Sequence, residues 1–211
     1  MNARTDEVAQ LGDDRLLDRV KVTRKSGTEP FRKGGASIGF DLREFWGWSG
    51  SDLVGNTARG RLAEFIVAKA LGVSTSGVRE EWMPFDLATP EGVKIEVKSS
   101  AYLQSWKQSR LSSIQFSIRP ARLWNPETNE IESRPARSAD LYVFALLAHR
   151  EKATLDPLDL DQWSFYVVPT RRLNEHTGDQ EKISLGPLER LAGSSVRFEQ
   201  LAAAVERASY G

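Results

Sequence analysis

The sequence contains no cysteine and only two histidines, His149 and His176. A chain without cysteine has no disulfides, no thiolate metal sites and no cysteine nucleophile, and this composition is typical of a reducing compartment. Two imidazoles are also too few for a multi-histidine zinc site. Neither a disulfide framework nor a histidine-rich metal centre is therefore expected.

Long apolar runs are missing as well. The longest, Leu141–Ala148, is far too short to span a bilayer, and residues 1–7 lack the apolar core of a signal peptide. We therefore expect a soluble, cytoplasmic protein with no membrane partner. The formal net charge is zero, whereas a nucleic-acid coat protein is usually basic, so any contact with nucleic acid must come from local patches.

The length of 211 residues, with 40% hydrophobic residues, suits one domain with a terminal extension. We assign residues 1–35 to a partly mobile N-terminal extension and residues 36–211 to a single domain. Residues 21–35 are basic and are interrupted by Gly and Pro, which fits either a solvated mobile arm or an arm that tracks phosphates. Ser37–Trp48 is rich in aromatic residues, which favours a core edge or a subunit interface over base stacking.

The most informative stretch is a predicted β-hairpin. From Val93 to Lys98 apolar and charged residues alternate, which indicates a half-buried strand with Val97 facing a core and Glu96 and Lys98 on the other face. Thr89–Gly92 suits a type I turn that ends with Gly in the left-handed region. This turn pairs Thr89 with Val93 and therefore sets Asp86 opposite Glu96.

The predicted pairing has a chemical consequence. Directly opposed residues have Cβ atoms about 5 Å apart, so the carboxylates of Asp86 and Glu96 would repel each other. One of them would be pushed towards protonation unless a cation lay between them. A hard divalent ion with oxygen ligands, such as Mg²⁺, relieves this repulsion best.

Asp86, nine intervening residues and then Glu96-Val97-Lys98 resemble the PD-(D/E)xK nuclease signature, although Phe85 separates Pro84 from Asp86. The resemblance implies a metal-dependent DNA endonuclease with catalytic Asp86, Glu96 and Lys98. Mg²⁺, for which Mn²⁺ can substitute, would be held by Asp86, Glu96 and the backbone carbonyl of Val97. A homodimer would be needed to cut both strands with one site per chain.

A third acidic residue lies on the strongest predicted helix, which begins at Ser51 or Asn56 and runs to Leu71, with Gly72 as its stop signal. Glu64 interrupts its largely apolar sequence. One interpretation is an ion pair with Arg61 one turn earlier. The other follows from the resemblance, because many members of the superfamily carry an acid on the helix before the signature strands; Glu64 would then be a further catalytic residue and metal ligand.

The remaining segments complete the predicted fold. Ile114–Arg119 alternates as a strand, Trp124–Arg137 reads as a loop or short hairpin, and Leu141–Ala148 and Trp163–Val168 read as buried strands. A closing helix is predicted over Val196–Ala208 with Ser195 as its cap. This order predicts an α+β (α/β) fold with a mixed central sheet flanked by helices, in agreement with the restriction-endonuclease-like core that the resemblance implies.

Local charge indicates where DNA would bind. Between Lys98 and Arg137 the chain has seven Lys or Arg and three Glu, so the surface near the signature is expected to be basic. The candidate DNA contacts there are Gln104, Trp106, Lys107, Arg110, Gln115 and Arg119. The alternative function is a nuclease fold that no longer cuts and serves as a DNA-binding or protein-interaction module.

Overall fold

The computed structural model describes residues 20–125 and 128–210. The sequence also predicts a short helix from Leu11 to Val22, with Leu16, Leu17 and Val20 as its apolar face; its residues up to 19 lie outside the described ranges, and residues 20–22 form no helix. None of the helices in the described ranges combines the length and apolar character needed to cross a membrane. The described strands and α-helices are β1 (Pro30–Lys33), β2 (Ala36–Asp41), α2 (Leu42–Gly50), α3 (Asn56–Ala70), β3 (Leu87–Ala88), β4 (Lys94–Ala101), β5 (Gln115–Ser117), β6 (Trp124–Asn125), β7 (Glu130–Ile131), β8 (Leu141–Leu147), β9 (Trp163–Pro169), α4 (Thr170–Thr177), β10 (Lys182–Ser184), α5 (Leu185–Ala192) and α6 (Leu201–Tyr210).

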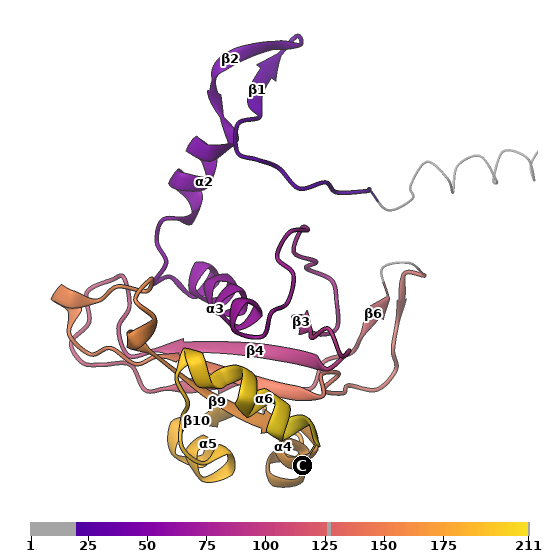
Figure 1. The fold of residues 1–211 in the computed structure, drawn as a ribbon, viewed down its shortest axis with the longest axis vertical. Helices are drawn as coiled ribbons and strands as arrows, with labels where there is room; N and C mark the ends of the chain where they lie inside the picture. Colours follow the sequence, from indigo (N-terminus) through magenta and orange to yellow (C-terminus); the bar gives the residue numbers. More distant parts are fainter. Residues whose placement is uncertain (1–19, 126–127, 211) are drawn as a thin grey trace, which may run out of the picture.

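The centre of the molecule is a four-stranded mixed sheet in the order β3-β4-β8-β9 (Figure 1). The β4 and β8 strands are parallel, whereas β3 and β9 run antiparallel to their neighbours. Helices flank the sheet, so the predicted α+β architecture is confirmed.

Strand β8 is buried on both faces along its whole length. Its odd-numbered residues, such as Val143, join a cluster with α3 and α6, and its even-numbered residues, such as Phe144, join a second cluster with β5, α4 and α5. An apolar strand with helices on both sides reads as a continuous hydrophobic run. This is the reason why the sequence from Leu141 to Leu147 shows no alternation.

Helix α3 ends one residue before the predicted limit. Gly72 follows with φ +67, the left-handed conformation that stops many helices. At the other end, the side chain of Asp52 accepts hydrogen bonds from the backbone N–H groups of Val54 and Gly55. The buried face of the helix, which includes Ala63 and Val67, packs on β4 and fixes the helix over the middle of the sheet.

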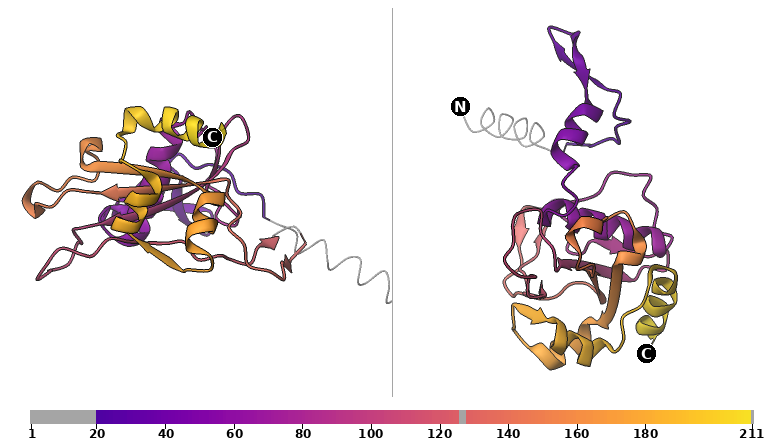
Figure 2. Two further views of the ribbon diagram at one scale, coloured as in Figure 1. Left: turned by 90° about the horizontal axis from the view of Figure 1, so that it is seen from below. Right: turned by 90° about the vertical axis from the view of Figure 1, so that its left-hand side faces the viewer.

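Residues 20–50 form an arm that stands off from the globular body (Figures 1 and 2). It consists of residues 20–29, which we call the approach segment, followed by the β1–β2 hairpin and α2. The predicted core edge is wrong, because the aromatic residues of this segment lie on the surface; Trp48 is 84% exposed, and α2 buries no residue. Residue 35 lies in the hairpin turn, and the division into extension and domain stays a prediction.

The C-terminal helix also differs from the prediction. Ser195 does not cap a helix and Val196 does not begin one, because Val196 exchanges two backbone hydrogen bonds with Phe165 on the free edge of β9, at 3.0 and 2.8 Å. A short 3-10 turn, Phe198–Gln200, follows before α6 begins at Leu201. Because Val196 pairs with the exposed backbone groups of the sheet edge, the helix begins five residues later than predicted.

Two smaller pairings complete the body. The predicted strand Ile114–Arg119 contains β5, and its alternation is confirmed because Phe116 is buried while Gln115 and Ser117 are exposed. It pairs with β10 outside the main sheet. Strands β6 and β7 form the short hairpin that was one of the two interpretations of Trp124–Arg137.

Candidate active site

The hairpin that carries the candidate carboxylates has the predicted register. Leu87 faces Ile95 and Ala88 faces Lys94, and Gly92 has φ +87 and donates its N–H to the carbonyl of Thr89 at 2.9 Å. Continuing this pairing by one residue sets Asp86 opposite Glu96. Val97 points into the core, where it is 6% exposed, so Glu96 and Lys98 lie on the other face of β4.

Strand β3 is only two residues long, because the chain leaves the regular ladder at Asp86. The backbone N–H of Asp86 donates to the carbonyl of Ile95 at 3.0 Å. The carboxylate of Asp86 accepts the backbone N–H of Val97 at 2.8 Å. The predicted register, continued by two more residues, would pair Pro84 with Lys98, but the ladder does not extend that far and Pro84 lines a cavity instead.

Two cations lie among the acids. The ammonium of Lys98 pairs with Glu96 on the same face of β4. Arg79, in the loop between α3 and β3, donates both from Nε and from Nη2 to the carboxylate of Glu64, the latter at 2.9 Å, and its Nη2 lies 3.8 Å from Asp86. The guanidinium thus links the helix acid to the hairpin acid.

The alternative pairing of Glu64 with Arg61 is wrong. Arg61 donates to Glu81 at 2.8 Å, and the partner of Glu64 comes from a loop fifteen residues further on. Sequence reasoning missed Arg79; the available signal was one basic residue directly before Glu80 and Glu81 in the connection to Asp86. A three-residue helix spacing makes an ion pair possible, but a bidentate partner from another element gives a stronger bond.

Asp86 is the acid whose pKa departs most from its ordinary value among the described carboxylates. Burial, followed by the negative charges of Glu96 and Glu64, raises the pKa of Asp86 from 3.8 to about 7; the Val97 N–H and Lys98 act in the opposite direction. The prediction that one of two facing carboxylates is pushed towards protonation is therefore confirmed in direction. A divalent cation at this place would release the proton.

Stability should consequently depend on pH through Asp86. Because its pKa is higher in the folded than in the unfolded chain, the folded state binds the proton more tightly between about pH 4 and pH 7, and the free energy of unfolding should fall as the pH rises through this window. Asp86→Asn keeps an oxygen for the Val97 N–H but cannot ionise. In the presence of a chelator, we expect it to be more stable than the wild type by about 1–3 kcal/mol at pH 8.

Urea unfolding of both proteins at several pH values measures this difference. Glu91→Gln is the matched control, because Glu91 is exposed in the turn of the same hairpin. A wild-type protein whose stability did not fall between pH 4 and pH 7 relative to Asp86→Asn would contradict the buried, partly protonated Asp86.

Two cavities flank Asp86. One, of about 340 Å³, is lined by Asp86, Glu96 and Tyr142 and has a basic and aromatic wall. That wall contains Arg119, Arg122, Arg137, Trp82 and Trp124. The other, of about 410 Å³, lies between α3 and the loop that carries Arg79. The acids therefore border open space on both sides of the hairpin, which gives an extended ligand room to reach them.

Tyr142 is a further residue of this site that the sequence did not indicate. It lies opposite Glu96 in the parallel register of β4 and β8 and is 4% exposed. Burial and the nearby charge of Glu96 raise the pKa of its hydroxyl, so the phenol stays protonated. It can donate a hydrogen bond to an oxygen bound in the cavity.

The predicted DNA contacts fall into separate groups. Arg119 borders the same cavity as Asp86 and Glu96 and pairs with Glu181 at 3.3 Å, and Gln115 is exposed on β5. Trp106, Lys107 and Arg110 are exposed in the loop after the far end of β4.

Gln104 is not available as a surface contact. It is 7% exposed, and its amide donates to the carbonyl of Ala101 and to the hydroxyl of Ser112. The amide nitrogen of Gln104 thus closes its own loop, whereas the buried side-chain oxygen has no hydrogen-bond partner among the described residues.

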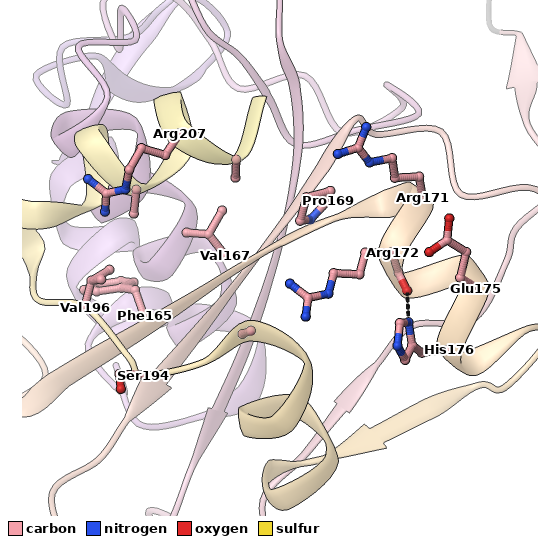
Figure 3. Close-up of a pocket in the computed structure, with 13 residues that line it drawn as sticks. Phe165, Val167, Pro169, Arg171, Arg172, Glu175, His176, Ser194, Val196 and Arg207 are labelled. Atoms are coloured by element: carbon pink, nitrogen blue, oxygen red, sulfur yellow. Dashed lines mark hydrogen bonds between the residues drawn. The ribbon is translucent and has the colours of Figure 1, made fainter. Parts of the chain in front are cut away.

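A larger cavity, of about 510 Å³, lies between α4 and α6 (Figure 3). Its polar lining includes Arg171, Arg172 and Arg207, and Glu175 is its one carboxylate. His176 is held by a hydrogen bond between its Nδ1 and the carbonyl of Arg172 at 2.8 Å. Without a pair of acids, this cavity does not offer the hydrolytic chemistry of the hairpin.

The acids of the hairpin, their lysine and the basic wall beside them are groups suited to a phosphodiester. The family model of bacteriophage T4 endonuclease IV matches residues 46–181, more than half of the chain. The chain belongs to this endonuclease family and is a DNA-hydrolysing enzyme. No curated protein and no solved structure matches the chain at a significant level.

Proposed function

We propose that the protein is a Mg²⁺-dependent DNA endonuclease of the PD-(D/E)xK type, with its active site at the β3–β4 hairpin. The observation that carries the proposal is the pairing of Asp86 with Glu96 beside Lys98, in the register that the turn dictates. The match to an endonuclease family gives DNA as the substrate. The metal and the superfamily follow from the chemistry of the donor set.

The donor set suits a hard divalent cation in part. Asp86 and Glu96 supply carboxylate oxygens whose mutual repulsion a cation relieves, and the backbone carbonyl of Val97 lies between Glu96 and Lys98 in the chain. Among the described residues, however, no three acids or histidines are grouped as a ready-made metal site. Glu64 is bonded to Arg79, so it would serve as a ligand only after leaving that arginine.

Bound at Asp86 and Glu96, Mg²⁺ or Mn²⁺ would neutralise phosphate charge and lower the pKa of a bound water. The groups of the chain supply the rest. The Lys98 ammonium, which pairs with Glu96 on the same face of β4, would stabilise the charge that develops on the phosphate. Arg119 of the basic wall and Tyr142, which lies beside Glu96 on β8, would bind the phosphodiester in the cavity.

Cleavage should therefore require a divalent cation. Closed circular DNA, offered in single-stranded and in supercoiled double-stranded form, is the appropriate substrate, because a circle has no ends and only an endonuclease can open it. With Mg²⁺ or Mn²⁺ we expect nicked or linear products on agarose gels, and with excess chelator we expect none.

The same gels distinguish the nuclease from the alternative function, a DNA-binding module that no longer cuts. A protein that shifts the mobility of DNA but leaves both circular forms intact with either metal would be a DNA-binding module that no longer cuts. The bond between Arg79 and Glu64 is the observation that favours this alternative, since it occupies one of the three acids. Cleavage that persists in excess chelator would instead contradict the metal-dependent mechanism.

A further inference from the structure

The arm formed by residues 20–50 lies mostly outside the family match, which begins at residue 46. Its strands and its approach segment are therefore an addition to the part of the chain that the endonuclease family describes. The arm has a defined structure of its own. The backbone N–H groups of Leu42 and Arg43 donate to the carbonyls of Glu29 and Gly27, at 3.1 and 2.9 Å, so the approach segment is tied to the start of α2.

The arm is basic, and its acidic side chains accept hydrogen bonds from backbone N–H groups within the arm. It has six Lys or Arg and three Asp or Glu. Glu29 accepts the N–H groups of Ser26 and Gly27, both at 2.9 Å. Asp41 and Glu44 form the capping box of α2. All three carboxylates therefore bond to backbone groups, and no salt bridge joins them to a cation of the arm.

The cations, in contrast, face solvent. Within the described residues the side chains of five of the six have no hydrogen-bond or ion-pair partner, namely those of Lys21, Lys25, Arg32, Lys33 and Arg43. Arg32 and Lys33 lie next to the hairpin tip, where Gly34 and Gly35 have φ +58 and +85. This two-glycine turn has both central residues at positive φ, as tight hairpins require, and it presents the two cations at the point furthest from α2.

Aromatic side chains are interleaved with these cations. The rings of Phe31 and Phe40 lie 4.6 Å apart on the hairpin, and Trp48 of α2 is 84% exposed. A short hairpin and a nine-residue helix bury too little apolar surface to be stable alone in water. A surface of exposed rings and unpaired cations is complementary to nucleic acid, in which bases can stack on rings and phosphates pair with cations.

The sixth cation connects the arm to the active site. The Nη1 of Arg24 donates to the carbonyl of Thr75 at 2.7 Å. Thr75 belongs to the loop after α3 that carries Arg79 and leads to Asp86. The arm is thus attached to the same loop whose arginine holds Glu64.

We infer that the arm is a second DNA-binding element, which binds the phosphate backbone through the hairpin tip and the approach segment while the body holds the strand to be cut. The inference rests on the proposed function for the identity of the substrate. The arm of a second copy would cover the aromatic rings equally well, but it would bring the same five unpaired cations against them, because its own acids already bond to backbone groups. The charge balance therefore favours DNA.

The experiment compares the double variant Arg32→Ala/Lys33→Ala with the control Arg171→Ala/Arg172→Ala. The control removes two exposed arginines from the cavity of Figure 3, at the other end of the molecule from the arm (Figure 1). Fluorescence anisotropy with a labelled oligonucleotide, as a single strand and as its duplex, gives the Kd in excess chelator over a range of salt concentrations. Thermal melts establish that each variant is folded.

The arm variant should bind DNA about tenfold more weakly than the wild type at moderate salt, and the slope of log K against log salt should fall by between about one and two. The control should keep the wild-type slope to within about half a unit. Equal Kd and slope for the arm variant and the wild type would overturn the inference, as would an equal loss in the control.

Self-association is the competing outcome, and Trp48→Ala detects it. If this variant turns a dimer into a monomer in sedimentation velocity while its Kd for DNA stays that of the wild type, the arm is a subunit interface and the inference fails. The binding assay needs no cleavage. If the protein cuts circular DNA but the arm variant binds DNA as tightly as the wild type, only this inference is overturned. If binding depends on the arm but no DNA is cut, only the proposed nuclease activity is overturned.

Discussion

Replacement of Glu96 by glutamine should reduce DNA cleavage by about a thousandfold while leaving the protein folded. The substitution keeps the size of the side chain and removes one negative charge from the proposed metal site and the partner of Lys98. Loss of the charge stabilisation that a bound cation supplies amounts to several kcal/mol, and each 1.36 kcal/mol is tenfold in rate. Initial rates of opening of circular DNA in Mg²⁺ measure the effect.

Glu91→Gln is the matched control, since it makes the same chemical change on an exposed turn residue of the same hairpin. It should cut at the wild-type rate. Binding of DNA in excess chelator should survive in both variants, because the phosphate contacts proposed for the body come from Arg119 and Tyr142. Wild-type cleavage by Glu96→Gln would exclude the hairpin as the active site, whatever other site then proved to cut.

Truncation of Phe144 to alanine should lower the free energy of unfolding by about 3–5 kcal/mol. The ring is fully buried in β8, 5.1 Å from the ring of Phe116 in an edge-to-face contact, and lies opposite Lys98 in the sheet. Nothing on the surface can collapse into the space that the ring leaves, because both faces of β8 are covered. Urea or guanidinium unfolding gives the loss.

Phe45→Ala serves as the comparison, because that ring is 45% exposed on α2. It should change the free energy of unfolding by less than about 1 kcal/mol. A similar loss for the two phenylalanines would contradict the assignment of β8 as the strand shared by both hydrophobic clusters.

The hairpin could be predicted from sequence because its determinants are local. The turn Thr89–Gly92 needs a glycine at positive φ in one place, and the two-residue period of β4 allows one register for a buried Val97. These two constraints suffice to set Asp86 against Glu96. A slip of one residue would have exposed Ile95 and buried Lys98, at a cost that no compensating contact offsets.

What the sequence did not reveal depends on partners that are distant in the chain. Arg79 reaches Glu64 across a loop without regular structure, and no spacing rule selects it over Arg61. Val196 leaves its helix pattern because the free edge of β9 offers two backbone hydrogen bonds. The composition of the aromatic segment suggested a core edge or a subunit interface, and the core edge was wrong because burial depends on what packs around a segment.

The two-residue length of β3 has a consequence for every variant of Asp86. A longer strand would pair the Val97 N–H with a backbone carbonyl, but here the Asp86 carboxylate accepts it at 2.8 Å. One oxygen of Asp86 is therefore used by the backbone of the hairpin, and the other lies 3.8 Å from the Arg79 guanidinium. Asp86→Ala would leave an N–H of a buried strand without its acceptor, so an inactive Asp86→Ala protein could reflect a damaged hairpin. The side chains of Glu96 and Lys98 pair with each other and not with the backbone of the hairpin. Substitutions at these two positions can therefore separate an effect on activity from an effect on folding.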